Sequence, residues 1–366
     1  MQNGTRFRRS SVAGLAGLIV TVVMIALPPA AQSSSAAGPA APAATVAPAL
    51  ARATGAGSQQ PGIAFESPAQ MGKDLDAIAA AGMTWVRADF FWSSIQAAGP
   101  TSYVWGPTDA FVKAAKARGL EVLALVAYAP PWARSGASDY SPPRDPRDYA
   151  NFVGVAARRY APSGVHAWEI WNEPNLAMFW YPKADSAAYT ALLKRAYLAI
   201  KAADPKAIVV SGGLSPAADT AKDRAPMTFL SEVYAHGGGG DFDAAGYHPY
   251  SYPYAPMYKA DWNTFYRTPD FHAIMTQHGD GAKAVWGTEM GFPTGTSSRA
   301  VNDQRQADDL VAAVKQWKTW GFTGPLMLYT VRDSSSNKAD VNANMGMYTV
   351  AGKAKPAAVA LRRALH

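Results

Sequence analysis

The chain has 366 residues, of which 49% are hydrophobic and 11% aromatic, and this is ample for one barrel-sized domain of roughly 250 residues. Its 34 Lys and Arg residues against 27 Asp and Glu give a net charge of +7, and no basic run in the body of the chain points to nucleic acid. The chain has no cysteine, which excludes disulfides, thiolate catalysis, Cys-ligated zinc and iron–sulfur clusters.

The N-terminal segment has the pattern of a secretory signal. A basic stretch at 6–9 precedes an apolar run at 12–27, and small residues follow. The run is short for the roughly 20 residues that a membrane span needs, so a cleaved signal over 1–32 is favoured over a retained anchor. Either outcome predicts an exported protein, secreted or held at the cell envelope, and the positive charge would suit weak association with an acidic envelope surface.

A composition change separates this segment from the rest of the chain. Residues 33–60 consist almost wholly of Ala, Pro, Ser, Gly and Thr, and such a segment has little apolar surface to bury. We therefore predict a disordered linker over 33–60 and a folded domain over 61–366.

Strand-like and helix-like patterns alternate eight times in the folded domain. The predicted strands, which are short, apolar and rich in β-branched or aromatic residues, are Gly62–Glu66, Thr84–Ala88, Glu121–Ala127, Ala167–Trp171, Ala207–Ser211, Phe242–Tyr247, Ala284–Thr288 and Leu326–Thr330. The predicted helices are Pro68–Ala81, Pro107–Arg118, Pro146–Tyr160, Ser186–Ala203, Met227–His236, Pro269–His278, Asn302–Trp320 and Lys355–His366. Eight such pairs predict an α/β fold of the (β/α)8 TIM-barrel type. A doubly wound open sheet is the alternative, but no Gly-x-Gly-x-x-Gly turn follows the first strand.

Two strands are predicted to end in a glutamate. The fourth stops at Glu173, because Pro174 cannot donate to a strand ladder and restricts the residue before it. The seventh ends at Glu289. Active sites of (β/α)8 barrels lie at these strand ends, so the two carboxyls are expected at one mouth. The alternative is that each is a salt-bridge partner in a loop.

Two carboxyls across a barrel mouth can divide acid and nucleophile roles in cleaving a sugar linkage. One keeps a proton for the leaving oxygen, while the other stays ionised to attack the anomeric carbon. Arg87 closes the second predicted strand, and an arginine beside the second carboxyl would hold the pKa of that carboxyl down. The alternative for Arg87 is a structural ion pair with Glu66 or Asp89.

The Trp-Asn-Glu-Pro sequence at the fourth strand and the acidic end of the seventh resemble the clan A glycoside hydrolases over the whole of 61–366. The segments 130–133 and 172–176 resemble families 39 and 5 of that clan, including relatives that act on bacterial exopolysaccharides. The resemblance implies a retaining reaction in which Glu173 is the general acid/base and Glu289 the nucleophile. It also implies substrate-binding roles for a further set of residues, namely Asn172 at the sugar 2-hydroxyl, Arg87 and Tyr250 beside the nucleophile, and His248 at the catalytic subsite.

The sequence departs from the clan pattern at the eighth strand, where many members carry a Trp that floors the sugar subsite. Tyr329 stands there instead. Trp132, Trp180 and Trp286 are the further rings that we expect to contact the glycan, since flat rings complement the C–H faces of sugars. The connection 251–268 is long for a barrel loop, and such loops tend to be functional.

No cofactor or metal is expected, because the six histidines are scattered and no His-Glu-x-x-His occurs. The sequence therefore predicts an exported retaining glycosidase that hydrolyses a β-linked polysaccharide, with the spread of loop aromatics favouring endo action. An exo-acting β-glycosidase is the first alternative. A carbohydrate-binding pseudoenzyme on the same scaffold is the second. Oligosaccharide or polysaccharide is the expected partner.

Overall fold

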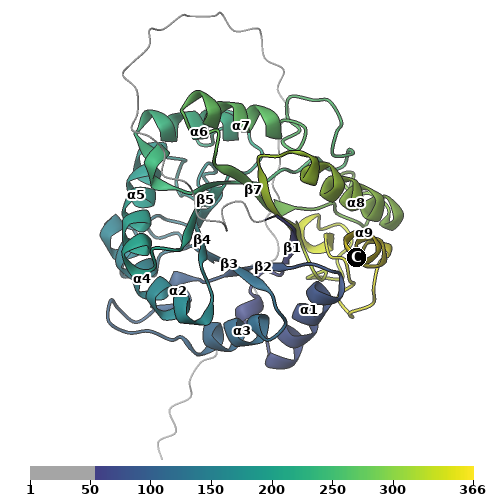
Figure 1. The fold of residues 1–366 in the computed structure, drawn as a ribbon, viewed down its shortest axis with the longest axis horizontal. Helices are drawn as coiled ribbons and strands as arrows, with labels where there is room; N and C mark the ends of the chain where they lie inside the picture. The colour runs from purple at the N-terminus through teal and green to yellow at the C-terminus, as the bar shows by residue number, and fades with distance from the viewer. Residues whose placement is uncertain (1–53) are drawn as a thin grey trace, which may run out of the picture.

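Eight parallel strands close into a barrel in the computed structural model, which describes residues 54–366 (Figure 1). Each strand pairs with the next along the chain, and the last pairs with the first. The strands are β1 (Ala56–Gln59), β2 (Trp85–Asp89), β3 (Glu121–Val126), β4 (Ala167–Asn172), β5 (Ile208–Gly213), β6 (Ala244–Tyr247), β7 (Ala284–Met290) and β8 (Thr323–Tyr329). This confirms the predicted (β/α)8 barrel over the open sheet.

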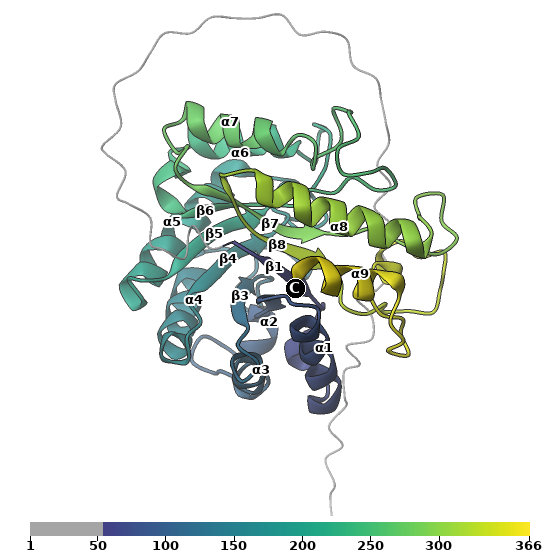
Figure 2. The ribbon, with the colours of Figure 1, turned by 45° about the vertical axis from the view of Figure 1, so that its right-hand side comes forward.

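Helices surround the strands as an outer ring, and α8 and α9 lie side by side on one flank (Figures 1 and 2). The helices are α1 (Pro68–Ala80), α2 (Trp92–Ile95), α3 (Gly106–Lys116), α4 (Pro146–Tyr160), α5 (Ser186–Ala203), α6 (Pro226–Ala235), α7 (Thr268–Gln277), α8 (Asp303–Thr319) and α9 (Pro356–Leu365). Several begin with Pro in the first turn, where its missing N–H would be unpaired anyway, and the Ser67 and Asp145 side chains cap α1 and α4. The single-turn α2 was not predicted.

The first strand lies earlier in the chain than predicted. It is Ala56–Gln59, whereas the predicted strand Gly62–Glu66 contains a 3-10 turn at Ile63–Phe65. The small residues that read as linker are required here, since a Cβ on Gly57 would lie 2.6 Å from Trp85 Cβ. The predicted linker 33–60 therefore overlaps β1, and the folded part starts before residue 61. The predicted signal at 1–32 lies outside the described residues.

The barrel interior changes from apolar to charged along its axis. One end is filled by an apolar cluster that includes Trp85, Leu123, Ile208, Trp286 and Met327, and the two indole rings meet edge to face at 5.2 Å. Inward-facing positions recur every second residue along a strand. The next inward layer is therefore the one that carries charge and leads to the mouth.

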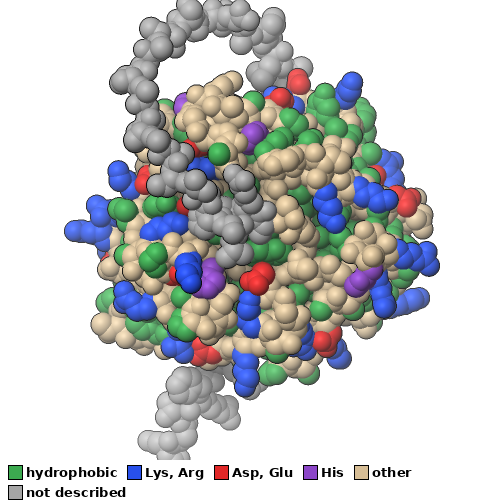
Figure 3. All heavy atoms as spheres, in the orientation of Figure 1, with side chains coloured by type: hydrophobic (Ala, Val, Ile, Leu, Met, Phe, Trp, Pro, Cys, Tyr) green, Lys and Arg blue, Asp and Glu red, His purple; other side chains and the backbone are tan. Residues whose placement is uncertain are grey.

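Lys and Arg side chains are spread around the face drawn in Figure 3 and do not form one patch there. Within residues 54–366, none of the helices combines the length and the apolar character that a membrane crossing requires.

Candidate active site

Arg87 is the centre of the charged layer above the apolar cluster. It lies two residues after Trp85 on β2, so both side chains point into the barrel, and Arg87 is fully buried. Its Nε and Nη2 bind the two oxygens of Glu169 at 2.6 and 3.0 Å. Its Nη1 donates to Glu289 Oε1 at 2.6 Å and to Gln59, and Nη2 also donates to Asn172 Oδ1 at 2.8 Å. All five guanidinium N–H groups are thereby paired, as a buried arginine requires.

The partners of Arg87 differ from those weighed in the sequence. Glu66 pairs instead with Arg332 at 2.8 Å, and Asp89 accepts the Gly62 N–H at 2.8 Å. Burial raises the pKa of Asp89 to about 6 despite that hydrogen bond and the charge of Arg87. The sequence analysis missed Glu169, although a charged residue at an inward position of an apolar strand was the available signal.

Glu173 lies immediately after β4, where the sequence placed it, and is 7% exposed. Its backbone adopts φ 47°, and its N–H donates to the Gly213 carbonyl at 3.1 Å. Glu173 Oε1 lies 2.8 Å from His248 Nδ1, and His248 follows β6. The predicted neighbours Glu173 and His248 therefore make direct contact.

Glu289 lies near the end of β7, where shifts in the pairing register with β8 interrupt the regular alternation. Tyr250 donates its hydroxyl to Glu289 Oε2 at 2.9 Å, opposite the guanidinium on Oε1. Burial alone would raise the pKa of Glu289. The charges of His248 and Arg87, with hydrogen bonds from Tyr250 and Arg87, outweigh burial and hold the pKa below its ordinary value. Glu289 is therefore kept ionised.

The two carboxyls stand close together. Glu173, His248 and Glu289 each offer an atom within 4.8 Å of the others, and His248 Nδ1 is 3.7 Å from Glu289 Oε2. Retaining glycosidases separate their carboxyls by about 5–5.5 Å, and inverting ones by about 6.5–9.5 Å. This atom-to-atom spacing lies on the retaining side of the two ranges. Three such ligand atoms could also hold a metal ion, but the guanidinium on Glu289 already balances its charge and disfavours a cation.

Backbone strain is concentrated at this mouth. Among the described residues, positive φ angles outside glycine occur at Tyr128 (64°), Trp171 (70°) and Glu173 (47°), all at or just beyond the ends of β3 and β4. Such conformations cost of order 1–3 kcal/mol each and persist only where the surroundings enforce them. Here the Trp171 indole donates to the Phe179 carbonyl at 2.7 Å, which fixes the ring that precedes Asn172. Glu173 carries one of these conformations at the point where β4 passes into the mouth.

Gly213, at the end of β5, lies directly against the His248 ring and, having no Cβ, leaves room for it. A Cβ there would fall well inside 3.0 Å of both His248 Nε2 and Thr288 Oγ1. Those two atoms are buried, and within residues 54–366 neither has a hydrogen-bond partner. The Gly213 N–H also donates to Glu169 Oε1 at 3.0 Å. Only glycine leaves His248 room at this position.

Of the four aromatic residues predicted to contact the glycan, two are partly exposed and two are buried. Tyr329 is half-buried at the end of β8, and burial followed by the nearby charge of Glu289 raises its pKa. Trp132 is half-buried, and its indole donates to the Gln96 carbonyl at 2.8 Å. Both keep surface open near the strand ends, so their sugar contacts stay predictions.

Trp180 and Trp286 are the two aromatic predictions that were wrong. Trp180 is 2% exposed and packs on Trp171 and Tyr189 at centroid distances of 5.3 and 5.8 Å. Trp286 belongs to the apolar cluster inside the barrel, against Trp85. Neither ring is available to a glycan, because loop path and strand register turn both into the core.

This closed barrel, with an arginine-bound carboxyl close beside a histidine-bound one, has the architecture of a retaining glycosidase. The chain belongs to glycoside hydrolase family 5, since the family model described as Cellulase (glycosyl hydrolase family 5) matches residues 51–324. It is therefore an enzyme that acts on carbohydrate. A comparison with curated proteins gave no significant match.

Several solved structures share the fold. The family 39 glycoside hydrolase of Bacteroides cellulosilyticus superimposes with a TM-score of 0.65 at 22% identity, covering 80% of this chain and 60% of its own. The monomeric β-xylosidase of Caulobacter crescentus superimposes with a TM-score of 0.65 at 18% identity, and the match covers 86% of this chain and 68% of that one. A family 5 enzyme of Streptomyces cattleya, solved in complex with Manβ1-4GlcNAc, superimposes with a TM-score of 0.64 at 17% identity. The match covers 85% of this chain and 79% of that one. At these identities the likeness supports the fold alone.

Proposed function

We propose that this protein is an exported glycosidase that cleaves a β-linked polysaccharide at internal linkages. Glu289 would be the nucleophile and Glu173 the acid/base. The observation that carries the proposal is the contrast between two carboxyls within 4.8 Å of each other. Glu289 is bound by Arg87 and Tyr250, whereas Glu173 contacts His248. The first set of partners favours a permanent carboxylate, and Glu173, which has no arginine partner among the described residues, is left for the acid/base role.

In the first step the Glu289 carboxylate attacks the anomeric carbon, and the bond to the leaving oxygen breaks as Glu173 gives that oxygen its proton. A covalent glycosyl ester on Glu289 results. In the second step Glu173 takes a proton from water, and the water oxygen bonds to the anomeric carbon. The ester bond breaks, and the Glu289 carboxylate is regenerated with Glu173 protonated again.

Other residues position the sugar in this scheme. The Asn172 amide oxygen is occupied by Arg87, so its amide nitrogen is the end that would donate to the sugar 2-hydroxyl. Tyr329 would form the floor of the catalytic subsite, and Trp132 would stack on a neighbouring sugar. His248 would hold Glu173 in place between its two protonation states.

Chemical rescue tests the two roles separately on an aryl β-glycoside. Glu289→Ala is expected to lose turnover, and azide should restore it through one displacement, which gives the inverted α-glycosyl azide. In Glu173→Ala, azide should intercept the covalent intermediate and give the retained β-glycosyl azide. Wild-type-like turnover of a poor leaving group by Glu173→Gln, or the opposite azide stereochemistry, would refute the assignment.

Endo action is supported by aromatic side chains on several mouth loops, including half-buried Trp132 and exposed Tyr181. The rival is exo action, which would release single sugars from chain ends. Chain lengths of the earliest products from a polymer separate the two. A ladder of oligosaccharides supports endo action, and only monosaccharide refutes it.

Export is supported by the basic and apolar pattern at 6–27, which lies outside the described residues. Secretion of the full chain from a bacterial host, with N-terminal sequencing of the product, tests it. A mature N-terminus between residue 28 and the start of β1 at Ala56 supports a cleaved signal. Retention of the intact chain in the cytosol refutes export.

A further inference from the structure

The connection between β6 and α7 is tied to the active site. Thr264 Oγ1 donates to the carbonyls of His248 and Tyr250 at 3.0 and 2.9 Å, and both of those residues contact a catalytic carboxyl. Asn263 Nδ2 donates to the carbonyls of Pro256 and Tyr258 at 3.0 and 2.7 Å. The outer part of this connection is therefore fixed by internal hydrogen bonds.

Three rings on this connection form a cluster open to solvent, which we call the outer aromatic cluster. Tyr254 stacks on Tyr258 at 4.4 Å, and Trp262 lies 5.4 and 6.2 Å from them. Tyr254 and Tyr258 remain 40% and 46% exposed. Rings that hold one another in place yet leave faces in water lose little entropy when a ligand stacks on them.

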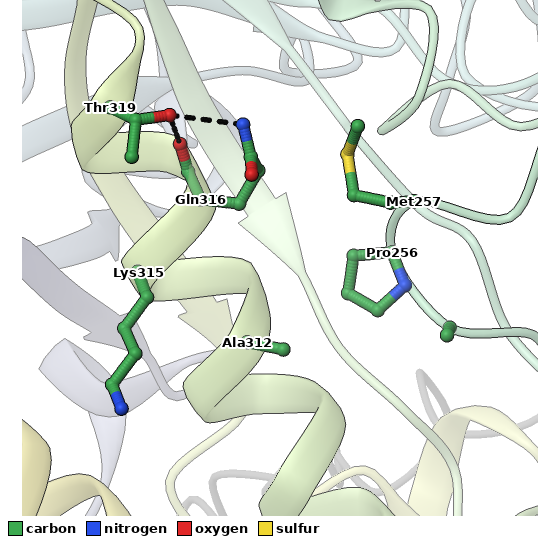
Figure 4. Close-up of a pocket in the computed structure, with 7 residues that line it drawn as sticks. Pro256, Met257, Ala312, Lys315, Gln316 and Thr319 are labelled. Carbon is green, nitrogen blue, oxygen red and sulfur yellow. Dashed lines mark hydrogen bonds between the residues drawn. The ribbon is translucent and has the colours of Figure 1, made fainter.

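A groove adjoins the outer aromatic cluster. Figure 4 shows Pro256 and Met257, which lie between the two tyrosines in the sequence, facing Ala312, Gln316 and Thr319 of α8. The groove holds about 300 Å³, at the lower end of the roughly 300–1,000 Å³ typical of ligand sites. The lining is mostly apolar, and its α8 side offers two polar groups, Gln316 Nε2 and Thr319 Oγ1, which hydrogen-bond to each other at 3.0 Å. The Lys315 side chain points away from Pro256 and Met257 (Figure 4).

We propose that the outer aromatic cluster and this groove form a second carbohydrate site, which holds a β-linked glycan chain away from the two catalytic carboxyls. The proposal rests on the proposed function. Sugar rings would stack on the exposed faces of Tyr254 and Tyr258. The sugar hydroxyls would hydrogen-bond to Gln316 and Thr319 along the groove. Apolar faces next to an amide and a hydroxyl match the two-sided chemistry of a pyranose.

The site would act on polymers and not on small substrates. A chain held here raises the local concentration of the same polymer at the mouth, because the connection is pinned to His248 and Tyr250. A short aryl glycoside does not reach both places. Loss of the cluster should therefore raise the KM for polymer while leaving hydrolysis of aryl glycosides intact.

The test compares wild type with the double variant Tyr254→Ala/Tyr258→Ala, with Leu198→Ala on α5 as a control that removes another exposed apolar side chain. Affinity electrophoresis in gels containing mixed-linkage β-glucan, xylan or mannan measures binding, and Glu289→Ala is run alongside to prevent hydrolysis. We expect at least one polymer to retard wild type, Glu289→Ala and Leu198→Ala, but not the double variant. The polymer KM of the double variant should rise roughly fivefold to tenfold.

Three outcomes overturn the proposal. They are retardation that survives in the double variant, absence of retardation by every polymer, and a wild-type dimer in sedimentation that the double variant splits, which would make the cluster a contact between copies. Aryl glycoside turnover separates this failure from failure of the proposed function. If wild type turns over aryl glycosides and Glu289→Ala does not, the proposed function stands even where the second site fails.

Discussion

Gly213→Ala is a small change that should lower activity strongly although it replaces none of the proposed catalytic side chains. The added methyl would fall more than 1 Å short of the 3.4 Å at which ordinary contact with His248 Nε2 and Thr288 Oγ1 begins. Behind Gly213 the β5 backbone is fixed, since its N–H donates to Glu169 and its carbonyl accepts from Glu173. His248 is therefore the group that must move, and with it the 2.8 Å contact to Glu173.

The size of the effect follows from this displacement. A misplacement of about 1 Å in a catalytic arrangement can lower the rate about a hundredfold, equal to about 2.7 kcal/mol of transition-state stabilisation. Overpacking of a filled core costs a further 1–3 kcal/mol or so of folding stability. We expect kcat on an aryl β-glycoside to fall about a hundredfold while the protein still folds.

The assay measures kcat, KM and urea unfolding for Gly213→Ala beside Gly240→Ala, whose Cβ would meet nothing within 4 Å. The control should behave as wild type in both measurements. A Gly213→Ala protein that folds and retains kcat within twofold would refute the reasoning, because His248 would then have room that the structure denies it. Activity lost only in proportion to unfolded protein would refute it as well.

Three further results are expected. Tyr250→Phe removes a hydrogen bond that lowers the pKa of Glu289, so the acidic limb of the pH profile of kcat/KM should move to higher pH. The value of kcat should also fall roughly tenfold to a hundredfold. An acidic limb that does not move would contradict this. Burial raises the pKa of Asp89 from 3.8 to about 6, so the ionised side chain destabilises the fold progressively as pH rises through that window. In urea unfolding at pH 8, Asp89→Asn should therefore have a free energy of unfolding roughly 2–3 kcal/mol above that of wild type, with a smaller gain at pH 4. No gain at pH 8 would count against it. Arg87→Leu leaves buried carboxylates unpaired and should cost about 3–5 kcal/mol, while the double variant Arg87→Leu/Glu169→Leu should recover part of that stability and no activity; additive losses in urea would contradict the pairing.

The positions of the two carboxyls of the candidate site were predictable because strand ends are visible in the sequence. Pro174 fixes where β4 stops, and the apolar run of β7 leads directly to Glu289. Eight repeats of strand and helix then bring both residues to one mouth, whatever the loops do. Arg87 and His248 follow by the same reasoning.

The rest depends on features that a single sequence does not display. Trp180 and Trp286 were misassigned because a ring near a strand end can face either the cleft or the core, and register and loop path decide which. The strand β1 was missed because its small residues fit between Trp85 and Met327, a constraint imposed by distant parts of the chain. For Glu169 the sequence showed a charge at an inward position of β4, but not the partner 82 positions away that this charge binds.

The five hydrogen bonds of Arg87 also order the events of biosynthesis. Its partners on β1 and β4 emerge early from the ribosome, whereas Glu289 on β7 arrives only after most of the domain has been made. A nascent chain that ends before residue 289 carries Glu173, the proposed acid/base, without Glu289, the proposed nucleophile. Truncated translation products would thus be inert toward glycans inside the producing cell, and hydrolytic competence would coincide with the last strands joining the barrel.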